Sequence, residues 1–345
     1  MTPERLRTAD FEYELPTDLI AQEPLPDRGG SRLLLVRRHD GRLVHSRFTE
    51  LPSLISAGDL LVINTTRVRH ARLSATRQSG APAEVLLIHP GPDGTWIAMG
   101  KPGTALRPGK RVGLGPGEWV ETVEVLSDGN RMVRFVGIDA EEAMLRYGQL
   151  PLPPYITRAP NPLDETRYQT VYAAAEGSIA APTAGLHFTP ALLEGLKSAG
   201  VIVEGLDLQV GPGTFKPVEV DDPAEHPMHP ERYQISSRLA EMVTQVRTKG
   251  GKVWAVGTTV VRALESAAQP DATVAAGSGE TRLMITPGYT FRVVDRLLTN
   301  FHLPRSTLLM LVCAFAGRQL TLAAYRYAVA ARYRFYSYGD AMVIM

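Results

Sequence analysis

The sequence predicts a mixed α/β protein in which a small antiparallel β-barrel is inserted into a larger α/β domain. Short strand-like runs separated by tight turns fill residues 66–150, whereas residues 1–65 and 151–345 mix strand-like runs with helical patterns. The 345 residues are enough for two domains of ordinary size. We therefore expect a discontinuous α/β catalytic domain from residues 1–65 and 151–345, and an inserted barrel domain from residues 66–150.

The elements before the insertion are short. Phe11–Leu15 alternates apolar and polar residues as a strand does, and a proline at its end introduces a short helix at Asp18–Ala21. Leu33–Arg37 and Leu43–Phe48 flank a turn that contains Asp-Gly, which predicts a hairpin. Asp59–Asn64 is a brief apolar run and is expected to be a buried strand.

The inserted segment is predicted to begin with six strands, because its sequence up to Val136 shows no helical period. Glycine, proline and aspartate clusters separate the runs, as in small antiparallel barrels. A helix at Asp139–Tyr147 and the proline-rich connector Leu150–Tyr155 follow them. The six predicted strands are Ala71–Thr76, Glu84–His89, Trp96–Met99, Arg111–Leu114, Thr122–Leu126 and Met132–Val136.

The rest of the chain mixes helices and strands. Thr189 and Gly200 are suitable residues for the start and the stop of a helix. The polar stretch Gln269–Gly279 is expected to be a mobile loop, and the apolar run Leu308–Ala316 a buried element. Helices are expected at Pro190–Ala199, Ser237–Lys249, Thr258–Ala268 and Leu320–Tyr333, and strands at Val201–Val210 and Val253–Val256.

Composition excludes several classes of protein. The single cysteine, Cys313, rules out a disulfide scaffold and cysteine-based zinc sites. Met1–Asp10 lacks the apolar core of a signal peptide, and the longest apolar run is far shorter than the roughly 20 residues that span a bilayer. We therefore expect a cytoplasmic protein that does not bind a membrane.

Arginine is concentrated at the C-terminal end of an almost neutral chain. The formal net charge is +1, but residues 281–345 alone carry a net charge of +6, and residues 151–280 carry −5. Arginine with interleaved aromatic residues suits phosphate contact and base stacking, so we expect RNA contact there. We assign most of these aromatic residues to the core, including Tyr325, Tyr327, Phe335 and Tyr336.

Two glycine-containing segments have a composition that core packing does not explain. Ser178–Thr189 places Thr183 and His187 in a loop before a helix start, where anions bind well. Val210–Pro217 holds two glycines around a proline, which leaves a surface free of side chains for a nucleoside or a phosphate. It matches neither the phosphate-binding loop of nucleotide hydrolases nor the dinucleotide-binding pattern.

Two further segments contain histidine. Prolines interrupt His226–Glu231, so proton transfer by His229 and Glu231 is favoured over metal binding there. Asp295–Thr307 gathers asparagine, histidine, arginine, serine and threonine directly before a buried run. We take this last segment as the best candidate for an active-site loop.

A fifth segment, Ala255–Glu265, reads as a strand that enters a Gly-Thr-Thr turn and then a helix. The N–H groups and hydroxyls at that helix start could hold a carboxylate or a ribose. The alternative is that Thr258 serves only as an ordinary N-cap. Arg262 and Glu265 are three residues apart on one helical face and could pair with each other.

Long ordered motifs run through nearly the whole chain. They include Phe11-Glu-Tyr-Glu-Leu-Pro16, Leu19-Ile-Ala-Gln-Glu-Pro24, Leu152-Pro-Pro-Tyr155, Tyr168-Gln-Thr-Val-Tyr-Ala173, Ala181-Pro-Thr-Ala-Gly-Leu-His-Phe-Thr189, Thr299-Asn-Phe-His-Leu-Pro-Arg-Ser-Thr-Leu-Leu-Met310 and Tyr333-Arg-Phe-Tyr-Ser-Tyr-Gly-Asp340. With these motifs the sequence resembles the S-adenosylmethionine:tRNA ribosyltransferase-isomerase family of queuosine biosynthesis. The resemblance implies a larger α/β domain with a small inserted β-barrel.

The resemblance also implies a reaction. The ribosyl part of S-adenosylmethionine would be moved to 7-aminomethyl-7-deazaguanine at the wobble position of a tRNA with a GUN anticodon. It would be isomerised to the epoxycyclopentanediol of epoxyqueuosine, with release of adenine and methionine. S-adenosylmethionine would then be a consumed substrate, so we expect no cofactor and no metal, and we expect a monomer.

This chemistry needs a base near the carbon beside the sulfonium, a proton donor for the leaving adenine, and deprotonation of the tRNA amine. We expect His187, His229 and His302 to carry protons, with Glu231 as a helper. The expected substrate-binding residues are Thr183, Gly211, Gly213, Thr214, Thr258, Arg262, Asn300, Arg305 and Ser306. The expected tRNA-binding residues are Arg67, Arg69, Arg72, Arg326, Arg332 and Arg334.

Two positions depart from the pattern of the family. This chain has Thr65 where the family usually has aspartate, and Gln209 where it usually has histidine. Glutamine keeps a hydrogen bond but does not titrate, so residue 209 is no proton carrier here. The alternative functions are a non-catalytic RNA-binding protein on the same scaffold and another S-adenosylmethionine-dependent nucleoside transferase.

Overall fold

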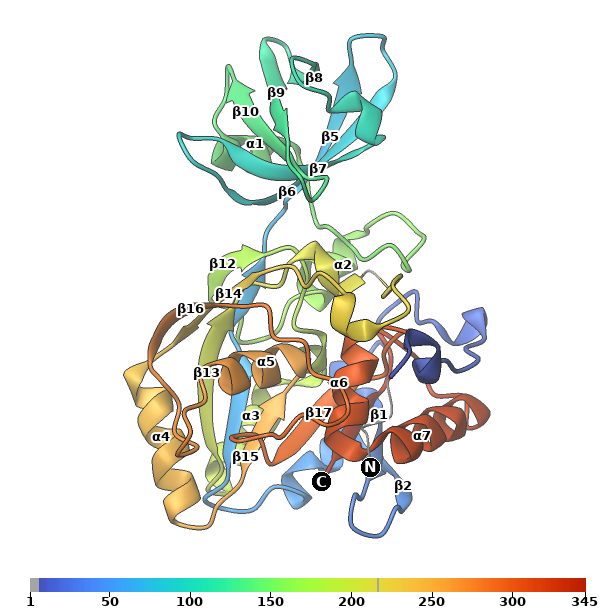
Figure 1. Cartoon of the computed structure of the whole chain (residues 1–345), viewed down its shortest axis with the longest axis vertical. Helices are drawn as coiled ribbons and strands as arrows, with labels where there is room; N and C mark the ends of the chain where they lie inside the picture. Colours follow the sequence, from blue (N-terminus) through green and yellow to red (C-terminus); the bar gives the residue numbers. More distant parts are fainter. Residues whose placement is uncertain (1–5, 216) are drawn as a thin grey trace.

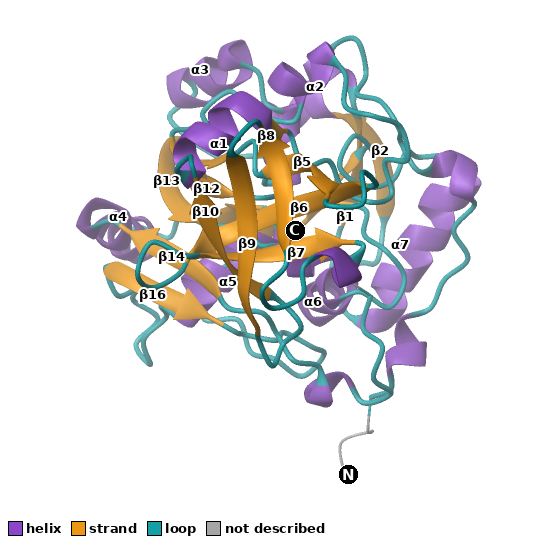
Figure 2. Cartoon of the chain, turned by 90° about the horizontal axis from the view of Figure 1, so that it is seen from above, coloured by secondary structure: helices purple, strands orange, loops and turns teal. Residues whose placement is uncertain are grey.

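The strands form one large sheet, one smaller antiparallel sheet and a two-stranded pair. This computed structural model describes residues 6–215 and 217–345. In Figure 1 the smaller sheet stands above a larger body that holds the nine-stranded sheet. Seen from above, the strands of the smaller sheet lie over the middle of the larger body, with α3, α4 and α7 around the rim (Figure 2). The helices are α1 (Ala140–Tyr147), α2 (Pro162–Arg167), α3 (Pro190–Ser198), α4 (Ser237–Thr248), α5 (Thr258–Ser266), α6 (Thr307–Ala316) and α7 (Arg318–Ala330).

The strands fall into these three groups by hydrogen bonding. In spatial order, the large sheet contains β16 (Gly277–Thr281), β14 (Glu231–Ile235), β13 (Ile202–Leu208), β3 (Leu60–Asn64), β15 (Val253–Val256), β17 (Arg296–Asn300), β18 (Ala341–Ile344), β1 (Arg32–Val36) and β2 (Leu43–Arg47). The smaller sheet contains β11 (Gly148–Gln149), β5 (Arg72–Arg77), β6 (Pro82–Pro90), β7 (Trp96–Lys101), β10 (Arg131–Val136), β9 (Glu118–Val125) and β8 (Arg111–Gly115). The pair is β12 (Ala175–Ser178) and β4 (Thr66–Val68).

Short 3₁₀ helices connect these elements. They are η1 (Thr8–Phe11), η2 (Thr17–Leu19), η3 (Arg28–Gly30), η4 (Phe48–Ser53), η5 (Gly103–Ala105), η6 (Thr183–His187), η7 (Pro212–Phe215) and η8 (Pro223–Glu225). Among the described residues no single helix is long and apolar enough to cross a membrane. Only α6 and α7 together, bent by 115°, satisfy that test of length and composition.

Four neighbouring strands in the middle of the large sheet are parallel to one another. β3 pairs in parallel with β13 on one side and with β15 on the other, and β15 pairs in parallel with β17. Their carboxyl ends therefore meet at one edge of the sheet. In open α/β sheets this edge is where ligands bind, because the loops and helix N-termini that follow the strands converge there.

Both faces of the large sheet are covered by apolar residues. Along β3, Leu60 and Val62 face the core formed with α4 to α7, whereas Leu61 and Ile63 face a second core formed with α3 and η4. A strand that is buried on both faces reads as a continuous apolar run. That is why the sequence of β3 could be identified as a buried strand.

The six strands predicted in the inserted segment are all present within a few residues of their expected positions. Each pairs antiparallel with its neighbours, and an additional pairing of β5 with β8 closes the six into a hydrogen-bonded ring around an apolar core. β4, however, pairs with β12 of the larger body. The exact domain boundaries at residues 65/66 and 150/151 stay a prediction.

Three local expectations were wrong. Phe11–Leu15 buries Phe11 and Tyr13 and exposes the glutamates between, but it pairs with no described strand, so its alternation reflects only an extended segment lying on the core. The loop expected at Gln269–Gly279 ends earlier, because residues 277–279 belong to edge strand β16, and its mobility stays a prediction. An isolated bridge joins Ala268 to Val274 within this stretch of chain. Tyr327, expected in the core, is 38% exposed.

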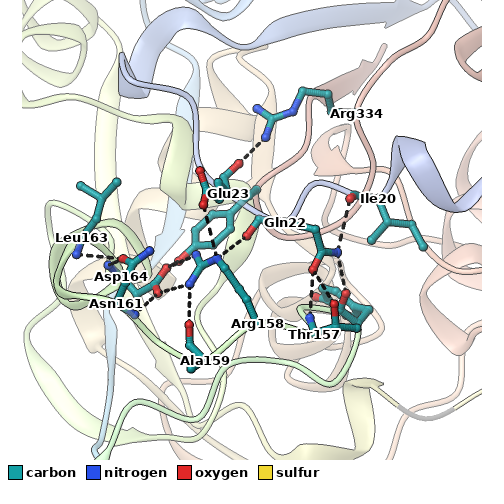
Figure 3. A network of polar contacts seen from close by, with 12 residues as sticks. Ile20, Gln22, Glu23, Thr157, Arg158, Ala159, Asn161, Leu163, Asp164 and Arg334 are labelled. Atoms are coloured by element: carbon teal, nitrogen blue, oxygen red, sulfur yellow. Dashed lines mark hydrogen bonds and ion pairs between the residues drawn. The ribbon is translucent and has the colours of Figure 1, made fainter.

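A buried carboxylate ties three distant parts of the chain together (Figure 3). Asp164 accepts two hydrogen bonds from Arg158, at 2.6 and 2.8 Å, one from the Asn161 N–H at 2.8 Å and one from the Tyr338 hydroxyl at 2.7 Å. Burial alone would raise the pKa of Asp164, but these hydrogen bonds outweigh it and hold the pKa below its ordinary value. Arg158 also bonds the carbonyl of Gln22, which fixes the N-terminal segment.

We predict that Asp164→Asn lowers the free energy of unfolding at neutral pH by about 3 kcal/mol, because it leaves Arg158 without its counter-charge. The pKa is depressed in the folded state, so this stability is present above about pH 4 and is lost as the pH falls further. Urea unfolding at several pH values measures both effects. Glu194→Gln, which breaks an exposed pair with Lys197, is the control and should change stability little. Equal stability of Asp164→Asn and the unsubstituted protein would contradict the assignment.

Candidate active site

A partly open pocket of about 670 Å³, a volume that includes solvent at its mouth, lies at the carboxyl edge of the parallel strands. The segments after β13, β15 and β17 each contribute to its wall, and the segment around Pro182 closes another side. Its lining residues are Tyr155, Ala180, Ala181, Pro182, Thr183, Ala184, Val210, Gly257, Thr258, Thr259, Thr299, Asn300, Phe301, His302, Leu303, Ser306, Leu308, Tyr336 and Ser337. Five of the predicted site residues are thus brought together: Thr183, Thr258, Asn300, His302 and Ser306.

The lining of this pocket contains no lysine, arginine, aspartate or glutamate. Its histidine, His302, is 8% exposed, and burial lowers the pKa of His302 to about 3. Nε2 of His302 lies 2.8 Å from the hydroxyl of Thr299, and Tyr13 donates a hydrogen bond to the His302 carbonyl. The imidazole is therefore neutral at physiological pH, and a pKa this low also makes it a weak base.

The start of α5 differs from the expectation. The N-cap is Gly257, whose φ of 93° places it in a backbone conformation that favours glycine, and Thr258 is the first helical residue. The alternative that Thr258 serves as an ordinary N-cap was therefore wrong. No side chain caps α5, whereas Ser306 caps α6 by accepting a hydrogen bond from the Leu309 N–H at 3.2 Å.

Asn300 is held rigidly at the end of β17. Its Nδ2 donates to the carbonyl of Tyr336 at 3.0 Å and to Nε2 of His187 at 3.2 Å. Because the Tyr336 carbonyl can only accept, the orientation of the amide is fixed. Its Oδ1 is buried and has no hydrogen-bond partner among the described residues. An acceptor of this kind at a pocket wall is available to a ligand.

His187 does not line the main pocket. It lies behind Asn300 and lines a separate cavity with Arg28 and Ser31. Nδ1 of His187 lies 2.9 Å from the Ser31 hydroxyl, and burial, with smaller effects of two arginines, lowers the pKa of His187 to about 3. The structure thus gives His187 the geometry of a residue that positions Asn300. A role in proton transfer stays a prediction.

A pair of tyrosines at the pocket wall was missed as a site feature by the sequence reasoning. Tyr155 and Tyr336 stack with ring centroids 4.5 Å apart, and the Tyr155 hydroxyl lies 2.7 Å from that of Ser337. Tyr336 has a φ of 69°, which is unfavourable for a residue with a bulky side chain. Strain of this kind is typical of functional sites. The only signal in the sequence was that both tyrosines end or lie within motifs of the family.

A second, smaller pocket of about 290 Å³ holds another group of predicted residues. His229, Glu231 and Arg262 line it, and Gly213 lies so close to the His229 ring that a Cβ at residue 213 would be 2.7 Å from it. Gly211 bonds the Glu231 carboxylate through its backbone. The side chain of Thr214 lies outside the described residues, so its predicted contact is not placed.

Arg262 forms a buried ion pair with Glu231, and both side chains are at most 6% exposed. Burial raises the pKa of Glu231, against smaller lowering effects of Arg262 and Gly211. The pairing of Arg262 with Glu265 suggested by their spacing is wrong, since Glu265 instead accepts hydrogen bonds from the backbone of Val293 and Val294. The positive charge of Arg262 is thus already neutralised by Glu231.

Arg305 does not line either pocket. Its side chain is 52% exposed and pairs with Glu12 at 2.7 Å. Gln209 also lies elsewhere, since it packs against Gly177 and lines a separate polar groove with Asp207. A titratable residue at position 209 would therefore face that groove and not the main pocket.

The arginines predicted to bind tRNA differ in their availability. Arg67, Arg69 and Arg72 bond Ala173, Glu141 and Leu152, respectively, around the junction between the two bodies. Arg326 is exposed on α7. Arg332 pairs with Asp18, and Arg334 is about half-buried against Glu23. None of these contacts tests RNA binding. Among the described residues, no group of three or more His, Cys, Asp or Glu could hold a metal ion.

We predict that Glu231→Ala destabilises the protein by about 3 kcal/mol or more, because it leaves Arg262 buried without a counter-charge. The double variant Glu231→Gln with Arg262→Met removes both charges and should regain part of that loss. Thermal and urea unfolding measure the difference. A double variant no more stable than Glu231→Ala would argue against the ion pair as the cause.

Comparisons with known proteins cover nearly the whole chain. Residues 8–344 match the family model described as queuosine biosynthesis protein. Two relatives named S-adenosylmethionine:tRNA ribosyltransferase-isomerase are similar: that of Symbiobacterium thermophilum is 51% identical, covering 99% of this chain and 100% of the relative, and that of Ralstonia nicotianae is 52% identical, covering 98% and 95%.

A solved structure is similar as well. The crystal structure of S-adenosylmethionine tRNA ribosyltransferase from Thermotoga maritima shares 36% identity with a TM-score of 0.57, covering 97% of this chain and 100% of that chain. Family model, relatives and structure all agree with the resemblance drawn from the motifs. The chain therefore belongs to the queuosine biosynthesis protein family.

Proposed function

We propose that this chain transfers and isomerises the ribosyl moiety of S-adenosylmethionine onto 7-aminomethyl-7-deazaguanine at the wobble position of tRNA. The products are epoxyqueuosine-tRNA, adenine and methionine. The observation that carries the proposal is the identity of about half of all residues, over essentially full length, with relatives named for this activity. S-adenosylmethionine is consumed, so the reaction uses it as a substrate and needs no resident cofactor.

The main pocket supports this reaction by its chemistry. An uncharged, largely buried lining suits a nucleoside. We assign the proton that leaves the carbon beside the sulfonium to His302, because it is the histidine in this lining. Glu231 and His229 line the neighbouring pocket, whose lining residue Thr307 directly follows Ser306 of the main pocket. We assign to His229, with Glu231, the proton transfers to adenine or from the tRNA amine.

The tRNA substrate requires a positively charged surface outside the pocket. We propose that Arg326, Arg332 and Arg334 contribute to it, together with Arg67, Arg69 and Arg72 at the junction between the two bodies. The ring of six strands would form a closed barrel domain that extends this surface. We further propose that the enzyme acts as a monomer in the cytoplasm on tRNAs with a GUN anticodon.

Release of adenine from S-adenosylmethionine, with and without a tRNA bearing the modified base, tests the proposed function. We expect adenine release that depends on this tRNA. Release without transfer to the tRNA would favour another S-adenosylmethionine-dependent nucleoside transferase. The absence of release, with tRNA still bound, would favour a non-catalytic RNA-binding protein.

We predict that His302→Gln and His229→Gln each lower kcat by about 100-fold or more, the usual effect of removing a general acid or base. His187→Gln should act indirectly, by disturbing the position of Asn300. The control is His39→Gln, because the His39 side chain is 74% exposed. Single-turnover adenine release measures the rates. If all three variants fold and keep normal turnover, the assignment of the histidines is wrong.

We predict that tRNA binding weakens steeply with salt, since each neutralised phosphate releases counterions. Arg326→Gln should weaken binding and reduce the slope against log salt by about 1. Lys197→Gln, at an exposed position of α3 that pairs with Glu194, is the matched control. Filter binding between low and moderate salt measures the slope, and a flat response would contradict the proposed surface.

A further inference from the structure

The N-terminus of α5 opens into the main pocket without a capping side chain. Gly257, Thr258 and Thr259 all line the pocket. We propose that this helix start binds the carboxylate of the methionine part of S-adenosylmethionine. The inference rests on the proposed function and adds the orientation of the substrate in its pocket.

The backbone at this point is arranged to receive an anion. The first N–H groups of a helix have no partner within the helix, and the helix dipole favours negative charge beside them. In α6, Ser306 supplies an oxygen to one of these groups. In α5 the N-cap is Gly257, which has no side chain to do so. An oxygen of a ligand can therefore replace the side-chain oxygen that is missing at this helix start.

A buried hydroxyl at the same spot provides independent support. Thr259 is 8% exposed, and its Oγ1 has no hydrogen-bond partner among the described residues. A Cβ added at Gly257 would lie 3.6 Å from this Oγ1, so the hydroxyl stands beside the open N-cap. Buried hydroxyls are normally bonded, and one that lines a pocket without a partner points to a ligand.

The described lining of the pocket offers no cationic side chain, so a bound carboxylate must be held by neutral donors. No lysine or arginine lines the pocket, and Arg262, the nearest candidate from the sequence, is paired with Glu231. S-adenosylmethionine has a single anionic group, its carboxylate, which must find its partners among neutral donors. A tRNA phosphate is a poorer occupant, because both Thr258 and Thr259 are more than nine-tenths buried.

With the carboxylate at the start of α5, other polar groups of the pocket remain for the rest of S-adenosylmethionine. Asn300 Oδ1 and the Tyr336 hydroxyl are also buried without a described partner, and both residues line the pocket. Asn300 Oδ1 can only accept, so it suits an N–H or O–H donor of the substrate and not its carboxylate. Among the described lining residues, the start of α5 combines helix N–H groups with an unpartnered hydroxyl, which suits an anion.

The test compares S-adenosylmethionine with its decarboxylated form, which keeps the adenosine, the sulfonium and the amine. Calorimetric binding to the full chain, with saturating tRNA that lacks the modified base, avoids turnover. We expect the unsubstituted protein to bind S-adenosylmethionine at least about tenfold more tightly. Thr259→Val should weaken the binding of S-adenosylmethionine by about tenfold, because the variant loses a hydrogen bond to a charged group. It should leave the binding of the decarboxylated form unchanged.

Two further variants keep the test independent of folding. Thr259→Ser retains the hydroxyl and should retain the preference for S-adenosylmethionine. Thr122→Val removes another buried hydroxyl without a described partner, on β9 of the smaller sheet, and should change neither affinity. Equal binding of the two compounds to the unsubstituted protein, or equal weakening by Thr259→Val, would overturn the placement while leaving the proposed function intact. Failure to bind S-adenosylmethionine at all would instead overturn the proposed function.

Discussion

Parallel pairing of β13, β3, β15 and β17 is the constraint on which the site depends. Each of these strands delivers the next segment of chain to the same edge of the sheet, and the pocket lies there. Segments far apart in the sequence, such as Gly257–Thr259 and Asn300–His302, become neighbours for this reason. The apolar residues on both faces of β3 hold the arrangement in place.

Buried polar groups of this molecule fall into two classes, those with hydrogen-bond partners and those without a described partner. Around Asp164 every oxygen has a partner, and the result is a rigid connection between the N-terminal, middle and C-terminal segments. Around the main pocket, Thr259, Asn300 and Tyr336 each keep a buried polar atom without a described partner. A satisfied network stabilises the fold, whereas unsatisfied groups at a cavity are ready for a ligand.

Electrostatics divides the candidate site into a neutral and a charged part. The main pocket relies on helix N–H groups, hydroxyls and a neutral imidazole, while the adjoining small pocket contains the buried pair of Glu231 and Arg262. The acidic surplus of residues 151–280 therefore does not lie in the wall of the main pocket. Neutral donors can hold an anionic group of a substrate without placing a charged side chain beside its sulfonium.

The sequence by itself determined the local elements and the family. Turn residues and alternating patterns are local signals, so the six strands of the ring, the strand Val253–Val256 and the helix starting at Ser237 could be predicted from their own residues. The long motifs likewise contain most of the residues that line the pocket, although only five lining residues were predicted as site residues.

Only the tertiary structure decided which side chains meet. The sequence did not separate His187 from His302, did not pair Arg262 with Glu231, and did not place Tyr336 at the wall of the pocket. Edge and C-terminal strands such as β16 and β18 were also missed, because their pairing partners lie far away in the chain. Hydrogen-bond partners, burial and positive φ values arise from contacts between distant segments, and a linear pattern carries no record of those contacts.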